Sequence, residues 1–273
     1  MSHSRRKHYG LGLGCKEMTV VDLASRRPLT SLPLDAYVPG VAHAVSADWG
    51  PSIAALAAQI GQGSGADLQV TVADEWARYW IFIVPEGVSR LEELQALAAT
   101  RFEALFGVSM QGWCMLADWR ATGAILVCAL PEKLVNALQA AGLKGWRVRS
   151  IQPSAVRLLG AFARQIPDEC WVAVYGRHGV LLARVAEGEV VHVRRHPLSK
   201  VVDVERLEDL LEAEILRLGG EAPPVLCVLG IEPPLEPDSK LAGMRLLMLQ
   251  QNEEAGRTVR SEAGTLALQG VRG

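Results

Sequence analysis

The residues of this chain whose types and spacing suggest chemistry lie near its start, where Gly10, Gly12 and Gly14 alternate with leucines. Glycine lets a backbone approach phosphate oxygens closely, and successive N–H groups in a turn form a concave anion site. A carboxylate at the end of such a strand adds the hard oxygen ligand that Mg²⁺ prefers. Residues 9–15 contain no carboxylate. The spacing therefore permits a phosphate cradle, but one without an anchor for the metal.

Two other interpretations of this segment stay open. A plain β-hairpin with a glycine-rich turn and no ligand explains the same residues. A dinucleotide-binding fingerprint fits less well, because no helix pattern opens after Gly14.

Composition restricts the class of protein. The 273 residues are 49% hydrophobic and 21% charged, which is typical of a folded chain with one large or two ordinary domains. A formal net charge of −2 gives no basic field for nucleic acid. The chain shows no secretory signal or transmembrane run, and its five cysteines include no Cys-x-x-Cys pair. We expect a cytoplasmic protein without a metal site; the basic residues 5–8 are a solvated terminus or a weak contact with an anionic membrane.

Apolar periodicity predicts the order three strands, helix, strand, helix, strand, helix twice. The first copy has strands at 8–13, 17–23, 41–47, 68–72 and 146–151, and helices that begin near Pro51, Pro131 and Ser154. The second copy has strands at 170–175, 179–186, 189–195, 224–229 and 244–249, and helices at 204–218 and 261–269. A strand-helix-strand-strand unit interrupts the first copy at 78–84, 89–106, 112–117 and 123–130, with Ser89 and Glu92 forming a capping box.

This order predicts a duplicated α/β fold. We place the first half at residues 1–166, with an inserted subdomain at about 76–130, and the second half at residues 167–273. Any ligand would lie in the cleft between the halves, against the first hairpin of each.

Four stretches of the chain resemble the pilus-assembly protein family PilM and the cytoplasmic part of the type II secretion family GspL. They are ALPEKLVNAL at 129–138, VRSIQP at 148–153, WVAVY at 171–175 and GVLLAR at 179–184. The ordered pattern covers nearly the whole chain. The resemblance implies a duplicated actin-like ATPase (RNase H-like) fold with an inserted subdomain.

The resemblance also implies that nucleotide chemistry is lost. In the actin-like superfamily the opening hairpin reads apolar-Gly-apolar-Asp-apolar-Gly, and Gly12 stands in the place of the aspartate. The acidic position of the second hairpin falls at Tyr175, and the adenosine-side glycine run is reduced to Gly230. We therefore expect no catalytic residue and no cofactor, with ATP disfavoured. A relic nucleotide cleft would contain Gly10, Gly12, Gly14, Lys16, Tyr175, Gly176 and Gly230.

Such a degenerate cleft could retain weak binding of anions without binding nucleotide. Lys16, Arg177 and His178 fall in the two hairpin turns and would give the cleft some affinity for an anion. Solvated turn residues are the simpler interpretation.

The function implied by the resemblance is a non-catalytic cytoplasmic scaffold at the inner membrane, in a type IV pilus or type II secretion assembly platform. Its partner would be the cytoplasmic tail of a PilN-like or GspM-like bitopic membrane protein, or the assembly ATPase. The inserted unit begins with Trp76, Tyr79 and Trp80, which are core residues or interface anchors. We expect the partner surface near residues 78–106. A functional ATP-binding or kinase-like enzyme is the alternative, and a chaperone-like or cytoskeletal protein is a third option.

Two further groups of residues have simple explanations. His192 and His196 share one face of a strand, but a third ligand is missing and two arginines separate them. Asp74 and Glu75 form an acidic pair that suits acid–base chemistry, although an exposed turn explains the pair as well.

Overall fold

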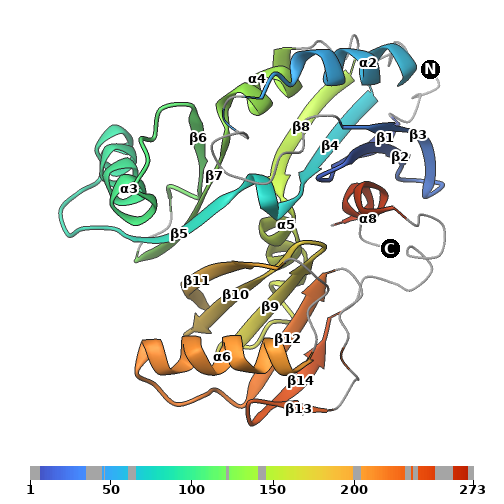
Figure 1. The fold of residues 1–273 in the computed structure, drawn as a ribbon. Coiled ribbons are helices and arrows are strands. Elements are labelled where there is room, and N and C mark those ends of the chain that lie inside the picture. The colour runs from blue at the N-terminus through green and yellow to red at the C-terminus, as the bar shows by residue number, and fades with distance from the viewer. Residues whose placement is uncertain are drawn as a thin grey trace, which may run out of the picture.

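In the computed structural model of this chain, residues 7–34, 45, 47–60, 66–120, 123–140, 146–198, 204–230, 235, 239–249 and 261–269 are described. Two large sheets and one smaller sheet account for the strands in these residues. Figure 1 shows the two large sheets one above the other, with the small sheet projecting to one side of the first.

The first large sheet has the order β3-β2-β1-β4-β8. Its strands are β1 (His8–Leu13), β2 (Glu17–Asp22), β3 (Arg27–Pro33), β4 (Ala66–Val72) and β8 (Trp146–Pro153). The hairpin β1–β2 is antiparallel, whereas β1, β4 and β8 run parallel. The helices α2 (Gly50–Ile60) and α4 (Glu132–Ala140) lie side by side along this sheet (Figure 1). The residues of its three central strands are almost all buried, as expected for a sheet with both faces covered.

The second large sheet repeats that order as β11-β10-β9-β12-β14, with β13 added at the edge. Its strands are β9 (Cys170–Gly176), β10 (Gly179–Ala186), β11 (Glu189–Pro197), β12 (Val225–Gly230), β13 (Lys240–Leu241) and β14 (Met244–Met248). Helix α6 (Val204–Leu218) covers one face with Leu207 and Leu211. The shared strand order confirms the predicted duplicated α/β fold.

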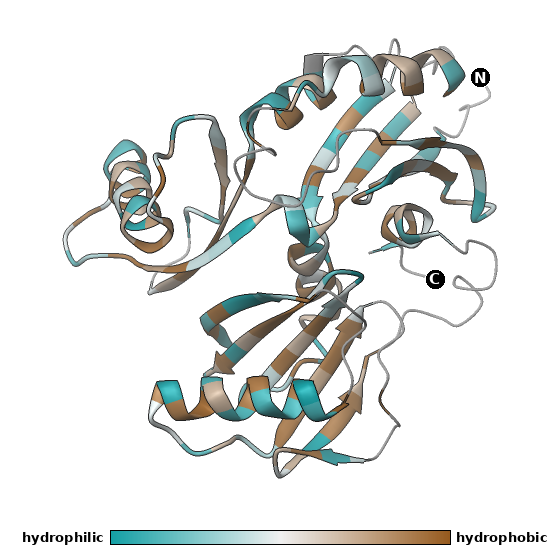
Figure 2. Cartoon of the chain, in the orientation of Figure 1, coloured by the Kyte–Doolittle hydropathy of each residue, from teal (hydrophilic) through white to brown (hydrophobic). Residues whose placement is uncertain are grey.

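The inserted unit forms a compact body of its own. It contains β5 (Arg78–Ile83), α3 (Leu91–Phe106), β6 (Trp113–Leu116) and β7 (Ala124–Pro131), with the sheet order β5-β7-β6. Leu94, Ala98 and Phe102 form the buried face of α3. The rings of Trp80 and Phe102 pack 5.4 Å apart in its core. Hydrophobic and hydrophilic residues are mixed along α3, as expected for a helix with one buried face (Figure 2).

Two helices connect the halves. Helix α5 (Ser154–Phe162) follows β8 and contacts both β4 and β12, so it lies at the junction (Figure 1). Helix α8 (Glu262–Leu268) comes last in the chain but packs on β1 and β2 of the first sheet. The sequence order placed residues 261–269 in the second half, and by its packing this helix belongs with the first.

Three local predictions differ from the structure. The third strand is β3, whereas most of residues 41–47 lies outside the described residues. The capping box at Ser89 is wrong, because Arg90 is the N-cap of α3 and makes no side-chain cap hydrogen bond. Pro153 rather than Ser154 is the N-cap of α5.

Candidate functional site

Three segments that are far apart in the sequence meet between the two halves. They are the β1–β2 turn, the β9–β10 turn and the start of α8, and they border a pocket of about 550 Å³. Its walls include Lys16, Glu17, Ser31, Arg177, His178 and Glu262. Charged groups of both signs face one another there, unlike the apolar lining of most small-molecule pockets. This is the place at which the sequence predicted a ligand cleft.

The glycines of the first strand serve the packing of α8. A Cβ atom on Gly12 would lie 1.7 Å from the carbonyl oxygen of Ala263, and one on Gly10 would lie 1.9 Å from that of Ala267. Real Cβ atoms do not approach backbone oxygens this closely, so only glycine allows the helix to lie on β1. No side chain at position 12 fits beneath the helix, and an aspartate there is excluded on the same ground.

Glu262 occupies the anion-binding side of the hairpin turn. Its carboxylate accepts a hydrogen bond from the backbone N–H of Cys15, and a Cβ on Gly14 would lie 3.0 Å from its Oε2. Burial, with a contribution from the Glu75 carboxylate, raises the pKa of Glu262 to about 7. An intramolecular carboxylate thus takes the N–H donor that the predicted cradle offers to a phosphate.

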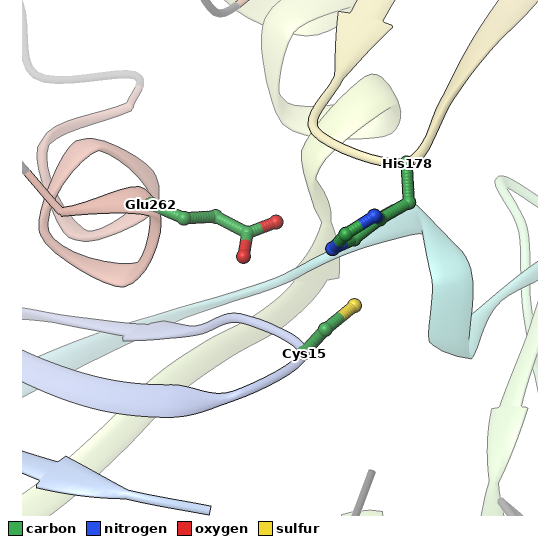
Figure 3. Close-up of side chains that lie close together, drawn as sticks. All are labelled: Cys15, His178 and Glu262. Atoms are coloured by element: carbon green, nitrogen blue, oxygen red, sulfur yellow. The ribbon is translucent and has the colours of Figure 1, made fainter. Parts of the chain in front are cut away.

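Cys15 and His178 complete the group around Glu262. Figure 3 shows the three side chains pointing into one space, from the β1–β2 turn, the β9–β10 turn and α8. Their ligand atoms all lie within 4.8 Å of one another. Burial and the nearby carboxylates of Glu75 and Glu262 raise the pKa of the Cys15 thiol, and burial lowers the pKa of His178. A nucleophilic cysteine needs a thiolate, so this environment does not suit catalysis by Cys15.

An ion pair joins the two halves beside this group. Nη2 of Arg195, on β11, lies 2.8 Å from Oε1 of Glu75 in the 3₁₀ helix η1 (Asp74–Trp76). Both side chains are largely buried, at 16% and 9% exposure. The same guanidinium donates to the carbonyl of His178. The first half therefore fixes the position of the second-half turn.

Asp74 is a core residue, so the expected exposed acidic turn is wrong. Its carboxylate accepts hydrogen bonds from the Tyr79 hydroxyl and from the backbone N–H of Ala155. Burial raises the pKa of Asp74 to about 6, although both hydrogen bonds act in the opposite direction. Asp74 ties the inserted unit to the start of α5.

The predicted nucleotide residues divide into two sets. Lys16 and Gly176 lie at the cleft, where a Cβ on Gly176 would be 3.6 Å from Glu75. Tyr175 and Gly230 do not, because Tyr175 packs in the core beneath α6 and a Cβ on Gly230 would lie 2.1 Å from the Tyr175 carbonyl. Tyr175 faces the opposite side of β9 from the cleft, since alternate residues of a strand point to opposite faces. The structure therefore does not assemble the predicted set as one site.

The aromatic residues predicted as interface anchors are buried. Trp76, Tyr79 and Trp80 are 3%, 7% and 2% exposed, so none of them lies on a surface that a partner can reach. Trp76 instead supports the cleft, because its Nε1 donates to the carbonyl of Gly14 at 3.2 Å. The partner surface cannot rest on these side chains.

His192 and His196 face a buried carboxylate from α6. Nε2 of His192 lies 3.0 Å from Glu214, and Nε2 of His196 lies 3.3 Å from it, while Arg194 and Arg217 approach from outside. The two histidines share one strand face as predicted. In this arrangement the two imidazoles lie against the carboxylate of Glu214, which is fully buried, and Arg194 and Arg217 supply positive charge beside it.

Comparison with known proteins places this geometry in a class. No family model matches the chain, and no curated protein is similar to it in sequence. Solved structures do match, and they share the actin-like ATPase fold. One is the PilM–PilN type IV pilus biogenesis complex, at 16% identity and a TM-score of 0.61, covering 98% of this chain and 100% of the matched one.

Two further structures support the same fold. The cytoplasmic domain of EpsL, an inner-membrane component of the Vibrio cholerae type II secretion system, is 13% identical with a TM-score of 0.53, covering 94% and 97% of the two chains. A Bacteroides thetaiotaomicron protein with an actin-like ATPase fold and unknown function is 10% identical with a TM-score of 0.52, covering 86% and 87%. The predicted resemblance is confirmed, and at these identities it establishes the fold.

Proposed function

We propose that this chain is a non-catalytic cytoplasmic scaffold of a type IV pilus or type II secretion assembly platform at the inner membrane. It docks the cytoplasmic tail of a PilN-like or GspM-like bitopic protein, with the assembly ATPase as a second contact. The likeness to the PilM–PilN complex and to the cytoplasmic domain of EpsL motivates the proposal. Among the described residues, no helix is long and apolar enough to cross a membrane.

The proposal that the protein is not catalytic rests on the β1–β2 hairpin, whose phosphate-binding side is occupied by α8 and Glu262. Backbone atoms of α8 leave no room for a carboxylate at Gly12, and Glu262 takes the turn N–H of Cys15. Hydrolysis of Mg·ATP requires both an anchored metal and a free phosphate cradle. The same observation counts against the alternative of an ATP-binding or kinase-like enzyme.

The partner surface remains on the inserted unit, with other side chains in place of the buried aromatics. Strand β5 ends its sheet and packs against β11 of the second half, and Ile83 at its outer end is 73% exposed. Leu91 and Leu97 of α3 are also exposed. Tail peptides commonly bind by adding a strand to the edge of a sheet. Backbone hydrogen bonds then provide affinity, and neighbouring apolar side chains provide specificity.

A binding assay with a matched control tests this proposal. A peptide with the sequence of the cytoplasmic tail of the proposed PilN-like partner is the probe, and its affinity is measured by calorimetry for wild type, Ile83→Asp and Leu216→Asp. Leu216 is 80% exposed on α6, far from the inserted unit, so it controls for the loss of an exposed apolar side chain. We expect Ile83→Asp to weaken binding by about 30-fold, the equivalent of about 2 kcal/mol, and Leu216→Asp to leave it unchanged. If no such tail binds, the scaffold function is wrong; equal effects of both variants would place the surface elsewhere.

A further inference from the structure

We infer that Cys15, His178 and Glu262 form a site for a thiophilic divalent cation of the Zn²⁺ or Co²⁺ type, which joins the two halves of the molecule. A thiol, an imidazole and a carboxylate are the three side-chain types that bind zinc in proteins. Each comes from a different element, so the sequence, which predicted no metal site, contains no ligand motif.

The geometry is close to that of a bound ion. Tetrahedral zinc with bonds of about 2.0–2.3 Å places its ligand atoms roughly 3.3–3.6 Å apart. The Cys15 sulfur, His178 nitrogen and Glu262 oxygen already lie within 4.8 Å of one another. A side-chain movement of about 1 Å brings them to bonding distance of one ion. Three protein ligands leave a fourth position on a tetrahedral ion, and His178 and Glu262 also line the pocket that contains Lys16 and Arg177.

The ligands are held by the surrounding structure. Glu262 is fixed by the N–H of Cys15, and Cys15 is fully buried beside the carboxylate of Glu75. The turn that carries His178 is held by Arg195, which bonds to the His178 carbonyl and to Glu75. Such outer contacts orient metal ligands and reduce the cost of ordering them.

The chemistry of the donors distinguishes this ion from magnesium. Magnesium prefers six hard oxygen ligands in near-octahedral geometry, whereas thiolate and imidazole favour zinc, cobalt and related ions. The cation would lie between the hairpin turns and would connect β1–β2, β9–β10 and α8 in one coordination sphere. Its function here is structural, because it stabilises the closed arrangement of the halves.

Spectroscopic titration of the full chain tests the site. After removal of metals by chelator, Co²⁺ is added and the thiolate-to-cobalt charge-transfer absorption is followed, with Zn²⁺ as competitor. We expect one equivalent of Co²⁺ to produce the absorption, Zn²⁺ to abolish it, and millimolar Mg²⁺ to have no effect. Cys15→Ala should remove the absorption, and His178→Gln, at a half-buried turn position, should weaken Co²⁺ binding at least about tenfold.

Cys114→Ala is the matched control, because Cys114 is a half-buried thiol of β6 outside the cluster. It should leave the titration unchanged, and circular dichroism verifies that each variant is folded. Absence of the charge-transfer band in wild type overturns the proposal even if Cys15→Ala fails to fold. A band that persists in His178→Gln with unchanged affinity, or that is lost in Cys114→Ala, would also overturn it.

Discussion

Replacing Gly12 by alanine tests whether the first hairpin is reserved for α8. The added methyl would lie 1.7 Å from the carbonyl oxygen of Ala263 and 2.6 Å from the backbone nitrogen of Ala267, and neither atom can turn away as a side chain can. The helix must shift or detach from β1. Detachment exposes four buried apolar side chains, which are those of Ala263, Leu266, Ala267 and Leu268, and the buried carboxylate of Glu262.

The size of the effect follows from this burial. A buried leucine contributes about 2 kcal/mol and an alanine methyl just under about 1 kcal/mol, so full detachment costs roughly 5 kcal/mol. A small shift of the helix costs about 1–3 kcal/mol. We therefore expect Gly12→Ala to lower the free energy of unfolding by roughly 1–5 kcal/mol, depending on whether α8 shifts or detaches, and Gly10→Ala to have a similar effect.

Urea unfolding measures the loss, and hydrogen exchange of residues 262–268 locates it. Gly160→Ala is the matched control, because Gly160 lies within α5 and a Cβ there meets no atom within 4 Å. It should be neutral or more stable by about 0.5–1 kcal/mol. A Gly12→Ala protein as stable as wild type, with α8 still protected from exchange, would refute the packing argument.

Three further predictions concern buried groups. Burial disfavours the ionised form of Asp74 in the folded protein, so the stability of wild type relative to Asp74→Asn should fall by roughly 3 kcal/mol as pH rises from about 4 to about 6. Urea unfolding at several pH values measures this difference. A difference that does not change with pH would contradict the raised pKa of Asp74. Glu75→Gln leaves the Arg195 guanidinium without its carboxylate partner between the halves and should lower the free energy of unfolding by about 3 kcal/mol. The double variant Glu75→Gln with Arg195→Met should lose less stability than the sum of the two single variants, as measured in a double-mutant cycle. If the two single losses simply add, the residues are not coupled. Trp80→Ala should lower the free energy of unfolding by about 3–5 kcal/mol, measured by thermal unfolding, whereas the exposed Ile83→Ser should lower it by under about 0.5 kcal/mol. A Trp80→Ala protein as stable as wild type would contradict the burial of Trp80 in the core.

The strongly periodic elements were predictable from the sequence. Helix α6 repeats apolar residues at helical spacing, and the β9–β10 hairpin reads as two nearly continuous apolar strands. Strand β3 was not predictable, because it is an almost wholly exposed edge strand with a proline at each end of its segment. Edge strands tolerate proline and need no apolar alternation, so they carry little sequence signal.

The site was only partly predictable. The glycine spacing marked the hairpin, but it could not reveal that α8, from the other end of the chain, fills the space. The aromatic residues of β5 were ambiguous for another reason. Tyr79 faces the core of the first half and Trp80 faces the core of the inserted unit, so both sides of the strand are covered. Cys15, His178 and Glu262 converge only through tertiary structure, and no local pattern connects them.

The central claim is that α8 and Glu262 occupy the first hairpin, where a phosphate would bind, and that the cleft does not process nucleotide. Calorimetric titration of the full chain with Mg·ATP tests it most directly, with orthophosphate release followed in the same samples. The account predicts no saturable binding at micromolar protein and no phosphate release, because α8 and Glu262 fill the first hairpin. Micromolar affinity that depends on magnesium, or turnover above the buffer rate, would contradict it.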